Sequence, residues 1–451
     1  MRKSKLAVAV LGALFAMSAE AGQYVLQASK WGASQAAAVA KAGGTVKFSN
    51  DAAGLAVVES ANPNFLAAVK AGGAITSGAA DMMIQWTQPV AIEDASIDPS
   101  NDRFYPGVQW APQSVEAPAA WAAGYTGAGV RVAVIDGGIY DLHQDLAGAI
   151  DVAKSVSFAS GTPNGCIEKF NCDTGTFWHG THVSGIIAAR DNDKGIVGIA
   201  PEATIVGVKA LHGGSGSFGA VISAIIYAGD RNGGKADVIN MSLGAEFDRR
   251  ETGAAELRSL LNRAVNYATS QGALVVVSAG NSAIDFDHAG NLTVTPAESG
   301  NAIAVSATGP VGFAVGATNF SHPASYSNYG NSLVWIAGPG GDFVYPGSEN
   351  CTRPLVSPAG SITRPCWVFD LVFSAARGPA ASTSSYAWAA GTSMAAPAVS
   401  AVAALIKQRN PNANAAQLKT KLAQSATDEG KVGQDNFYGA GYVNARRAVT
   451  Q

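Results

Sequence analysis

A carboxylate, an imidazole and a hydroxyl stand at three places in this sequence where each could take part in the same reaction. Asp136 ends the apolar run 132–135, His179 opens the stretch 179–185, and Ser393 lies in Gly-Thr-Ser-Met-Ala-Ala-Pro ahead of a helical apolar run. A serine at the start of a helix has its hydroxyl near the positive end of the helix dipole. The three residue types are those of a nucleophile, its general base and an orienting carboxylate.

Each of these residues also has an ordinary structural explanation. Ser393 can cap a helix, and Asp136 can bond its own backbone in a turn. His179 and His182 are three residues apart and could face one metal ion. However, the zinc motif H-E-x-x-H and a third ligand are missing, so we do not expect a metal there. Only the combination of residues favours catalysis.

A further polar residue stands at the exit of another buried strand. Asn281 follows the run Leu-Val-Val-Val-Ser-Ala-Gly at residues 274–280. An amide in this place can donate a hydrogen bond to an oxyanion that develops during acyl transfer. Taken alone, it would be an ordinary turn residue.

The order Asp136, His179, Asn281, Ser393 along the chain resembles that of the subtilisin-type serine peptidases, the subtilases. The resemblance extends over roughly residues 110–451. It rests on Val-Ala-Val-Ile-Asp at 132–136, His-Gly-Thr-His-Val at 179–183, Ser-Ala-Gly-Asn at 278–281 and the heptapeptide at 391–397. One position departs from the family, because Gly137 follows Asp136 where Thr or Ser is usual. That change could loosen the hydrogen bonding around the carboxylate.

The resemblance implies a role for each residue. Ser393 attacks the scissile carbonyl, His179 carries its proton to the leaving amine, and Asp136 holds the imidazole tautomer. Asn281 and the backbone N–H of Ser393 stabilise the oxyanion, and His182 is a neighbouring structural histidine. The implied substrate-binding residues, between which a peptide would lie as a strand, are Gly214, Ser215, Gly216, Phe218, Ser242, Leu243, Gly244, Ala279 and Gly280.

The walls of this implied binding site indicate a specificity. The residues at 242–244 and 279–280 are small or apolar and uncharged. We therefore expect apolar or aromatic P1 side chains, with Val294 near the pocket floor, and an apolar P4 side chain beside Phe218.

Residues 214–219 also match the dinucleotide fingerprint G-x-G-x-x-G, between a strand and a helix. The next strand, 238–243, ends without the acidic residue that would bind a ribose, and Asp237 precedes it instead. An oxidoreductase is nevertheless one alternative. A catalytically silent relative used for binding is another, against which the full set of catalytic residues argues. An esterase is disfavoured because no G-x-S-x-G motif surrounds Ser393.

The resemblance implies a structural calcium ion as well. Subtilases bind calcium at a loop that matches the one after the His179 helix, and oxygen ligands from a tight loop suit this ion. The alternative is a solvated polar turn. The matching ligands would be the side chains of Asp145 and Asn192 and the carbonyls of Arg190, Lys194 and Ile196.

The segments between the motifs predict an α/β fold. Apolar strand-like runs alternate with helical stretches, which is typical of a mainly parallel central sheet with helices on both faces. Reactive groups in such sheets gather at the carboxyl ends of the strands. The predicted strands are 130–136, 204–211, 238–243, 273–278 and 302–307, and the predicted helices are 181–190, 220–230, 254–271 and 398–406.

Residues 22–93 show the order β-α-β-β-α-β of a small ferredoxin-like α+β unit. Its predicted strands are 24–28, 45–48, 54–59 and 82–86, and its predicted helices are 34–42 and 64–71. By pattern and position the unit is similar to the inhibitory propeptide of subtilases. We therefore expect a propeptide domain at 22–93, a linker at 94–106 and a catalytic domain at 107–451, with self-cleavage between about Trp86 and Pro106.

The first residues predict export. A basic start precedes an apolar core at 6–17, and Ala-Glu-Ala at 19–21 is a small-x-small cleavage site, so we expect a signal peptide at 1–21. The core is too short to span a bilayer, and no later stretch reaches the length required. Export permits disulfides. Of the three possible sets of pairs, we expect the two local disulfides, which close short polar loops: Cys166 with Cys172, and Cys351 with Cys366.

The composition is consistent with an exported enzyme. The chain has 451 residues, of which 47% are hydrophobic and 14% charged, and a formal net charge of −3. This length is ample for a large core, and the charge gives no electrostatic argument for nucleic acid. We expect a secreted (extracellular or periplasmic) monomeric endopeptidase, made as a zymogen. It would act on protein or peptide substrates, with its own propeptide as inhibitor and without nucleic-acid or membrane partners.

Overall fold

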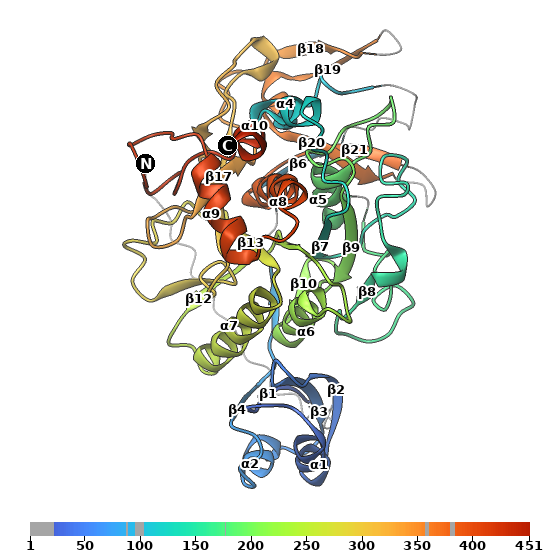
Figure 1. Ribbon diagram of the computed structural model, residues 1–451, viewed down its shortest axis with the longest axis vertical. Coiled ribbons are helices and arrows are strands. Elements are labelled where there is room, and N and C mark those ends of the chain that lie inside the picture. The colour runs from blue at the N-terminus through green and yellow to red at the C-terminus, as the bar shows by residue number, and fades with distance from the viewer. Residues whose placement is uncertain (1–21, 87–88, 95–102, 176, 357–359, 379–383) are drawn as a thin grey trace, which may run out of the picture.

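The computed structural model of the chain describes residues 22–86, 89–94, 103–175, 177–356, 360–378 and 384–451 (Figure 1). The predicted signal peptide and residues 95–102 of the predicted linker lie outside these ranges. Within the described ranges, every helix is too short or too polar to cross a lipid bilayer.

A mainly parallel sheet forms the centre of the larger part of the molecule, as predicted. Its strands run in the order β16-β15-β13-β11-β7-β9-β8, and β17 also pairs with β15. All of these pairings are parallel except that of β16 with β15. The strands are β7 (Arg131–Asp136), β8 (Val156–Ser157), β9 (Thr204–Lys209), β11 (Val238–Met241), β13 (Leu274–Ser278), β15 (Ile303–Gly309), β16 (His322–Pro323) and β17 (Ile336–Pro339).

Helices cover both faces of this sheet because successive strand residues point to opposite sides. In β7, Val132 and Val134 join the core that contains α5 and α8, whereas Ala133 and Ile135 join the core that contains α6 and α7. Strands buried on both faces are apolar throughout, which explains the continuous runs in the sequence. The helices are α5 (His179–Ala188), α6 (Phe218–Gly229), α7 (Ala254–Ser270) and α8 (Thr392–Arg409).

Smaller elements surround the sheet. Both predicted disulfides are present, Cys166–Cys172 and Cys351–Cys366. The pairs β12–β14, β18–β19 and β20–β21 are antiparallel. These elements are α3 (Ala111–Ser114), α4 (Ala117–Ala122), β10 (Ser215–Ser217), β12 (Ala245–Asp248), β14 (Leu292–Thr295), β18 (Asn350–Pro354), β19 (Ser361–Pro365), β20 (Val372–Arg377), β21 (Ser384–Ala390), α9 (Ala415–Ser425) and α10 (Ala445–Thr450).

The N-terminal part folds into its own antiparallel sheet, ordered β2-β3-β1-β4. Its helices share a core with one face of that sheet, which includes Leu26, Val58 and Phe65. The predicted β-α-β-β-α-β order is therefore present. Its elements are β1 (Gly22–Gln27), α1 (Ala33–Lys41), β2 (Gly44–Asn50), β3 (Leu55–Ser60), α2 (Phe65–Lys70) and β4 (Ser77–Ala80).

The other face of this N-terminal sheet packs on α6 and α7, at the lower end of the view in Figure 1. Leu55 and Val57 belong to the same apolar core as residues of those two helices. Arg263 of α7 donates from Nη2 to the carbonyl of Ala28, at 3.1 Å. The N-terminal unit is therefore docked by both apolar and hydrogen-bonding contacts.

The predicted fourth strand of the N-terminal unit is wrong. Residues 82–86 leave that sheet, and β5 (Met83–Gln85) pairs antiparallel with β10 instead. The fourth strand is β4, whose sequence Ser-Gly-Ala-Ala lacks the apolar alternation by which a strand is recognised. Gly78 is required there, because a Cβ would lie 2.6 Å from the Leu26 side chain. β6 (Ala91–Asp94) also leaves the unit and pairs antiparallel with β21, so the predicted domain boundary at residue 93 falls within β6.

Candidate active site

Asp136 and His179 meet at the carboxyl end of β7. Asp136 is the last residue of that strand and is 1% exposed, and His179 is the first residue of α5. Nδ1 of the imidazole lies 2.9 and 2.8 Å from the two carboxylate oxygens, and the N–H of Gly137 donates to the same carboxylate at 2.7 Å. A carboxylate at Nδ1 favours the tautomer that leaves Nε2 free to act as a base.

Ser393 is the second residue of α8, and its hydroxyl does not cap the helix. Its Oγ donates to the carbonyl of Ser242 at 3.1 Å, and the hydroxyl of Ser242 donates back to the carbonyl of Ser393 at 2.7 Å. Gly391 occupies the N-cap position, so the alternative of Ser393 as a simple cap is wrong. Nε2 of His179 has no hydrogen-bond partner within the described ranges. Contacts between a base and its nucleophile often tighten only when substrate binds.

Asn281 is held by the first residue of α8. Its Oδ1 accepts hydrogen bonds from the N–H and the hydroxyl of Thr392, at 2.9 and 2.7 Å. A Cβ on Gly391 would lie 3.4 Å from Nδ2 of Asn281 and 3.4 Å from Cα of Pro89. Because position 391 is a glycine, no side chain of that residue stands between the amide group and Pro89.

Asn328 supports this loop, and the sequence analysis missed it. The buried side chain accepts from the N–H of Ser282 at 3.0 Å and donates to the carbonyl of Ala279 at 3.0 Å, on either side of Asn281. It also donates to Oε1 of Glu246, at 2.7 Å. The only signal in the sequence is Ser-Asn-Tyr-Gly, which reads as a turn.

A cleft of about 290 Å³ lies beside Asp136 and His179. Ser242, the partner of the Ser393 hydroxyl, forms part of its wall, so the candidate nucleophile is next to the same cleft. The remaining lining comes from three loops, from β6 and from Pro89 ahead of β6: Pro89, Ile92, Gly137, Asp173, Thr174, Gly175, Phe177, Trp178, Leu211, Gly213 and Gly214.

On one side of the cleft, the chain's own β5 pairs with β10, which belongs to the segment predicted to bind a peptide strand. The N–H of Trp86 donates to the carbonyl of Gly214, and its indole N–H donates to the carbonyl of Gly216, each at 3.1 Å. The buried Trp86 ring lies 5.5 Å from the ring of Phe218. Ser215 pairs with Gln85. The predicted residues of this segment therefore pair with the chain's own residues 83–86, which are added as a strand.

On the other side of the cleft, the chain runs alongside β21 and pairs with it. The N–H of Val90 donates to the carbonyl of Ala390 at 2.8 Å, and β6 continues the pairing from there. Pro89 lines the cleft itself. Trp86 and Pro89 thus flank the pair of Asp136 and His179, while residues 87 and 88 lie outside the described ranges.

The other predicted binding residues lie between β11 and β12 and after β13, and all of them are buried: Ser242, Leu243, Gly244, Ala279 and Gly280. Gly280 has a φ of +101°, and a Cβ there would lie 2.9 Å from Oε1 of Glu246. This carboxylate is a charged neighbour that the sequence analysis did not include. Val294 is buried in β14 opposite Glu246.

The predicted calcium ligands gather around one buried carboxylate. Oδ2 of Asp145 accepts from the hydroxyl of Tyr386 at 2.8 Å and from the N–H of Ile196 at 3.0 Å. Oδ1 of Asp145 and Oδ1 of Asn192 are both buried without a hydrogen-bond partner among the described residues. Burial raises the pKa of Asp145 to about 7. Two unpartnered oxygen atoms from neighbouring segments could supply two of the roughly six to eight oxygen ligands that a calcium ion takes.

The carbonyl ligands belong to the loop that follows α5 and are Arg190, Lys194 and Ile196. The N–H of Arg190 donates to the carbonyl of Asp145 at 2.7 Å, which joins the loop to the carboxylate segment. Arg103 pairs with Asp191 and Asp193 of the same loop, at 2.9 and 2.8 Å. No group of three His, Cys, Asp or Glu side chains in the described part of the chain could hold a metal, so an ion here would depend on carbonyl ligands.

His182 and the glycine-rich segment take no part in cofactor binding in this arrangement. Nε2 of His182 contacts the carbonyl of Ala387 at 3.1 Å, and burial lowers the pKa of the imidazole to about 3. The N–H of Gly219 at the start of α6 donates to Oδ1 of Asp81, at 2.9 Å. A carboxylate of the N-terminal unit therefore occupies the helix start that a pyrophosphate would need in the dinucleotide alternative.

Comparison with known proteins agrees with the fold and the motifs. Residues 127–441 match the Subtilase family. The chain is 36% identical over 344 residues to Subtilisin Savinase from Lederbergia lenta, which covers 76% of this chain and 98% of that protein. A protease from Pseudoalteromonas arctica is similar in structure, with 28% identity and a TM-score of 0.59 over 77% of this chain and 98% of that one. The epidermin leader peptide processing serine protease of Staphylococcus aureus shares the fold, with a TM-score of 0.72 and 21% identity over 95% of this chain and 98% of that one.

Proposed function

Because the chain belongs to the subtilase family and is a serine endopeptidase, we propose that Asp136, His179 and Ser393 form its catalytic triad. We also propose that it is made as a secreted zymogen that cuts itself. The observation that carries the proposal is the contact of 2.8 Å between Asp136 and Nδ1 of His179, beside a cleft that the chain's own Pro89 and Ile92 line.

In this mechanism Nε2 of His179 takes the proton of Ser393 as Oγ forms a bond to the scissile carbonyl carbon. Oγ must first turn away from the carbonyl of Ser242, its present partner. Asp136 stabilises the resulting imidazolium. His179 then gives the proton to the leaving amine as the C–N bond breaks, and water repeats the sequence to release the acyl group.

The oxyanion is assigned to Nδ2 of Asn281 and the backbone N–H of Ser393. The two hydrogen bonds from Thr392 to Oδ1 of Asn281 support this assignment, because they fix the amide plane before substrate arrives. A donor that is already oriented needs no reorganisation when charge develops on the carbonyl oxygen.

The N-terminal unit, 22–93, is proposed as an inhibitory propeptide, followed by a linker at 94–106 and a catalytic domain at 107–451. The strand pairing of β5 with β10 supports an inhibitory role, because a substrate needs the same backbone groups. Trp86 contacts one wall of the cleft and Pro89 lines it, so we propose that the self-cleaved bond lies between about Trp86 and Pro106. Peptides and proteins are the proposed substrates.

The proposed preference is for apolar P1 side chains, with Phe218 favouring an apolar P4. The packing of Trp86 on Phe218 supports an aromatic or apolar group beside that ring. The carboxylate of Glu246 is held by Asn328, which reduces its capacity to select a basic P1 side chain.

Asp145, Asn192 and the carbonyls of Arg190, Lys194 and Ile196 are proposed to hold one calcium ion. The ion would link the loop after α5 to the segment of Asp145 and neutralise a buried carboxylate. Residues 1–21 are proposed as a signal peptide, from their basic start and short apolar core, and the mature enzyme as an extracellular or periplasmic monomer.

The oxyanion assignment predicts a loss of turnover. Replacing Asn281 with Ala should lower kcat by about 10²–10³ with little change in KM, the effect that loss of one oxyanion donor has in subtilisin. Asn301, an exposed asparagine that donates to Asn266, provides the control, and Asn301→Ala should keep the parent kinetics. A rise in KM with kcat unchanged would contradict the assignment.

The specificity proposal predicts the profile of a mixed peptide library. Apolar and aromatic side chains should dominate at P1, and Phe218→Ala should weaken the apolar preference at P4 while leaving P1 unchanged. A profile dominated by Arg or Lys at P1 would refute the proposal and point to Glu246 as the selecting residue.

The calcium proposal predicts that a chelator lowers the thermal midpoint and that excess calcium restores it by mass action. Because the pKa of Asp145 without calcium is about 7, the ion must displace a proton below that pH. The calcium-dependent rise in Tm should therefore be smaller well below pH 7 than above it, and Asp145→Asn should reduce it at both. A thermal midpoint that a chelator leaves unchanged would indicate that the loop is a solvated polar turn without a calcium ion.

The zymogen proposal predicts the N-terminus of the exported protein. The parent should begin between about residues 87 and 106, whereas Ser393→Ala should accumulate uncut from near Gly22, because no acyl-enzyme can form. N-terminal sequencing after expression in a protease-free host measures both. Processing of the alanine variant at the same bond would disprove self-cleavage, and failure of the released unit to inhibit the mature enzyme would disprove the propeptide role.

A further inference from the structure

The glycine that departs from the family pattern, Gly137, makes room for a carboxylate from another loop. A Cβ on Gly137 would lie 2.2 Å from Oδ2 of Asp173, so that carboxylate and any side chain at position 137 exclude each other. We propose that Asp173 is a positioning residue that fixes the backbone beside the catalytic Asp136, in place of a side chain at position 137. This inference rests on the triad proposed above.

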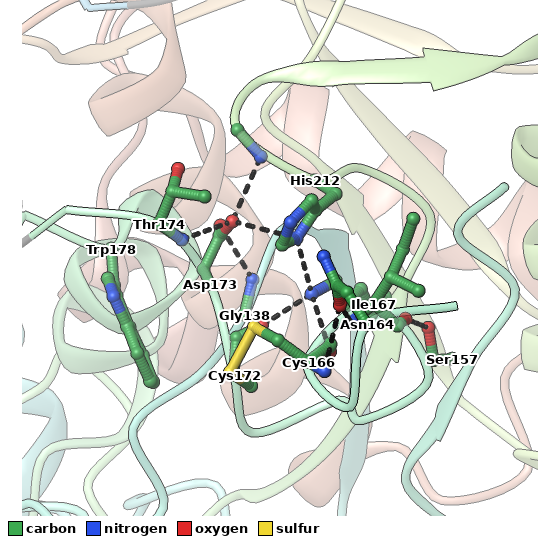
Figure 2. The surroundings of a disulfide bond; sticks show 12 residues. Gly138, Ser157, Asn164, Cys166, Ile167, Cys172, Asp173, Thr174, Trp178 and His212 are labelled. Atoms are coloured by element: carbon green, nitrogen blue, oxygen red, sulfur yellow. Dashed lines mark hydrogen bonds and ion pairs between the residues drawn. A yellow bond between two sulfur atoms is a disulfide. The ribbon is translucent and has the colours of Figure 1, made fainter. Parts of the chain in front are cut away.

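Asp173 accepts three backbone hydrogen bonds. Oδ2 accepts from the N–H of Gly138 at 3.0 Å, and Oδ1 accepts from the N–H groups of Thr174 and Gly213 at 2.9 and 3.0 Å. Gly138 stands two residues after the catalytic carboxylate, and Gly213 directly precedes the segment that binds the peptide strand. One side chain therefore joins the turn behind the triad to the wall of the binding site (Figure 2).

Asp173 directly follows a loop, residues 166–172, that is closed by a disulfide. Cys172 precedes Asp173 and is bonded to Cys166. The loop also lies directly on the turn, because a Cβ on Gly138 would be 2.5 Å from the carbonyl of Cys172. Figure 2 shows the disulfide next to Gly138 and Asp173. A short covalent loop restricts the positions that the carboxylate can take.

The buried side chain of Lys209 forms hydrogen bonds with the same loop. Lys209 is the last residue of β9 and pairs in register with Asp136 of β7. Its ammonium group donates to the carbonyls of Cys172 and Cys166, the latter at 3.3 Å, and to Nδ1 of His212 at 3.1 Å. A buried cation needs such partners. Lys209 therefore links the disulfide loop to β9, the strand that pairs with β7.

Asp173 is a positioning residue rather than a substrate-binding one. Its side chain is 8% exposed, although it lines the cleft. Both of its oxygens already accept backbone hydrogen bonds, and His212 lies 3.6 Å from Oδ1. Loss of this side chain should therefore disturb the position of the triad more than the affinity for peptide.

The first test is Asp173→Asn in the full chain, assayed after active-site titration of the matured enzyme. The amide keeps the shape but turns an NH2 group toward one backbone N–H, so at least one hydrogen bond is lost. We expect kcat to fall about tenfold or more, with KM within about twofold, because small displacements of catalytic groups act on turnover. A parent value of kcat, or a change in KM alone, would overturn the proposal.

Asp141→Asn is the matched control. The carboxylate of Asp141 accepts from Nδ2 of Asn171, in the same disulfide loop, at 3.2 Å from each oxygen, but does not contact the turn at Gly137. It should keep the parent kcat and KM. Ser393→Ala belongs to the same series, because activity in that variant would overturn the triad itself. An inactive Ser393→Ala with a fully active Asp173→Asn would overturn only the positioning role.

The second test exchanges the two side chains. Gly137→Ser alone should lower kcat because the new Cβ displaces Asp173, and Asp173→Gly alone should lower it because the turn is released. The double variant Gly137→Ser/Asp173→Gly should recover most of the turnover, since the serine then occupies the vacated space. If the decreases in kcat of the two single variants were additive in the double variant, the proposal would be contradicted. The thermal midpoints of the two single variants and the double variant show whether a decrease in kcat comes from a decrease in stability.

The disulfide provides a third, independent test. Cys166→Ser together with Cys172→Ser should lower kcat with KM unchanged, as in Asp173→Asn, because the carboxylate is no longer restrained. Cys351→Ser with Cys366→Ser removes the other disulfide, which lies on β18 and beyond β19, and should leave kcat unchanged. Equal effects of the two pairs on turnover would show that the first disulfide has no specific tie to the triad.

Discussion

The burial of α8 against the central sheet is the contact on which the site depends. Every residue from 392 to 406 is buried, and small side chains allow the strands to approach the helix closely. Ser400 donates to Oδ1 of Asn240 in β11 at 2.9 Å, which fixes the helix along its axis. Since Ser393 and the partner of Asn281 both stand in its first turn, their positions follow from the packing of a rigid element and not from a loop.

The open strand edges around the cleft form the second constraint. β10 and β21 each have backbone groups that a neighbouring strand must satisfy, and the chain supplies β5 and β6 for them. The N-terminal unit can reach both because its sheet is docked on α6 and α7. In the proposed zymogen, substrate and the N-terminal unit would therefore compete for the same backbone hydrogen bonds.

The parts of the structure that were predictable are those encoded by short local patterns. The buried strand before Asp136 and the heptapeptide around Ser393 each combine a secondary-structure signal with a reactive side chain. The partner of residues 82–86 was not predictable, because an apolar strand pattern does not say which sheet edge accepts it. Asp173 and Asn328 were missed for a related reason: their roles depend on turns that come close only in the folded chain.

The two strands that the chain adds at the cleft, β5 and β6, have a consequence for which proteins this enzyme can digest. A substrate must offer a comparably long stretch with its backbone N–H and C=O groups unpaired, and native proteins keep most of theirs in helices and sheets. Such a stretch becomes available mainly through local opening of the target. The rate of attack on a native protein would then report how often that protein opens, so conformational stability, as much as side-chain sequence, would decide which proteins survive.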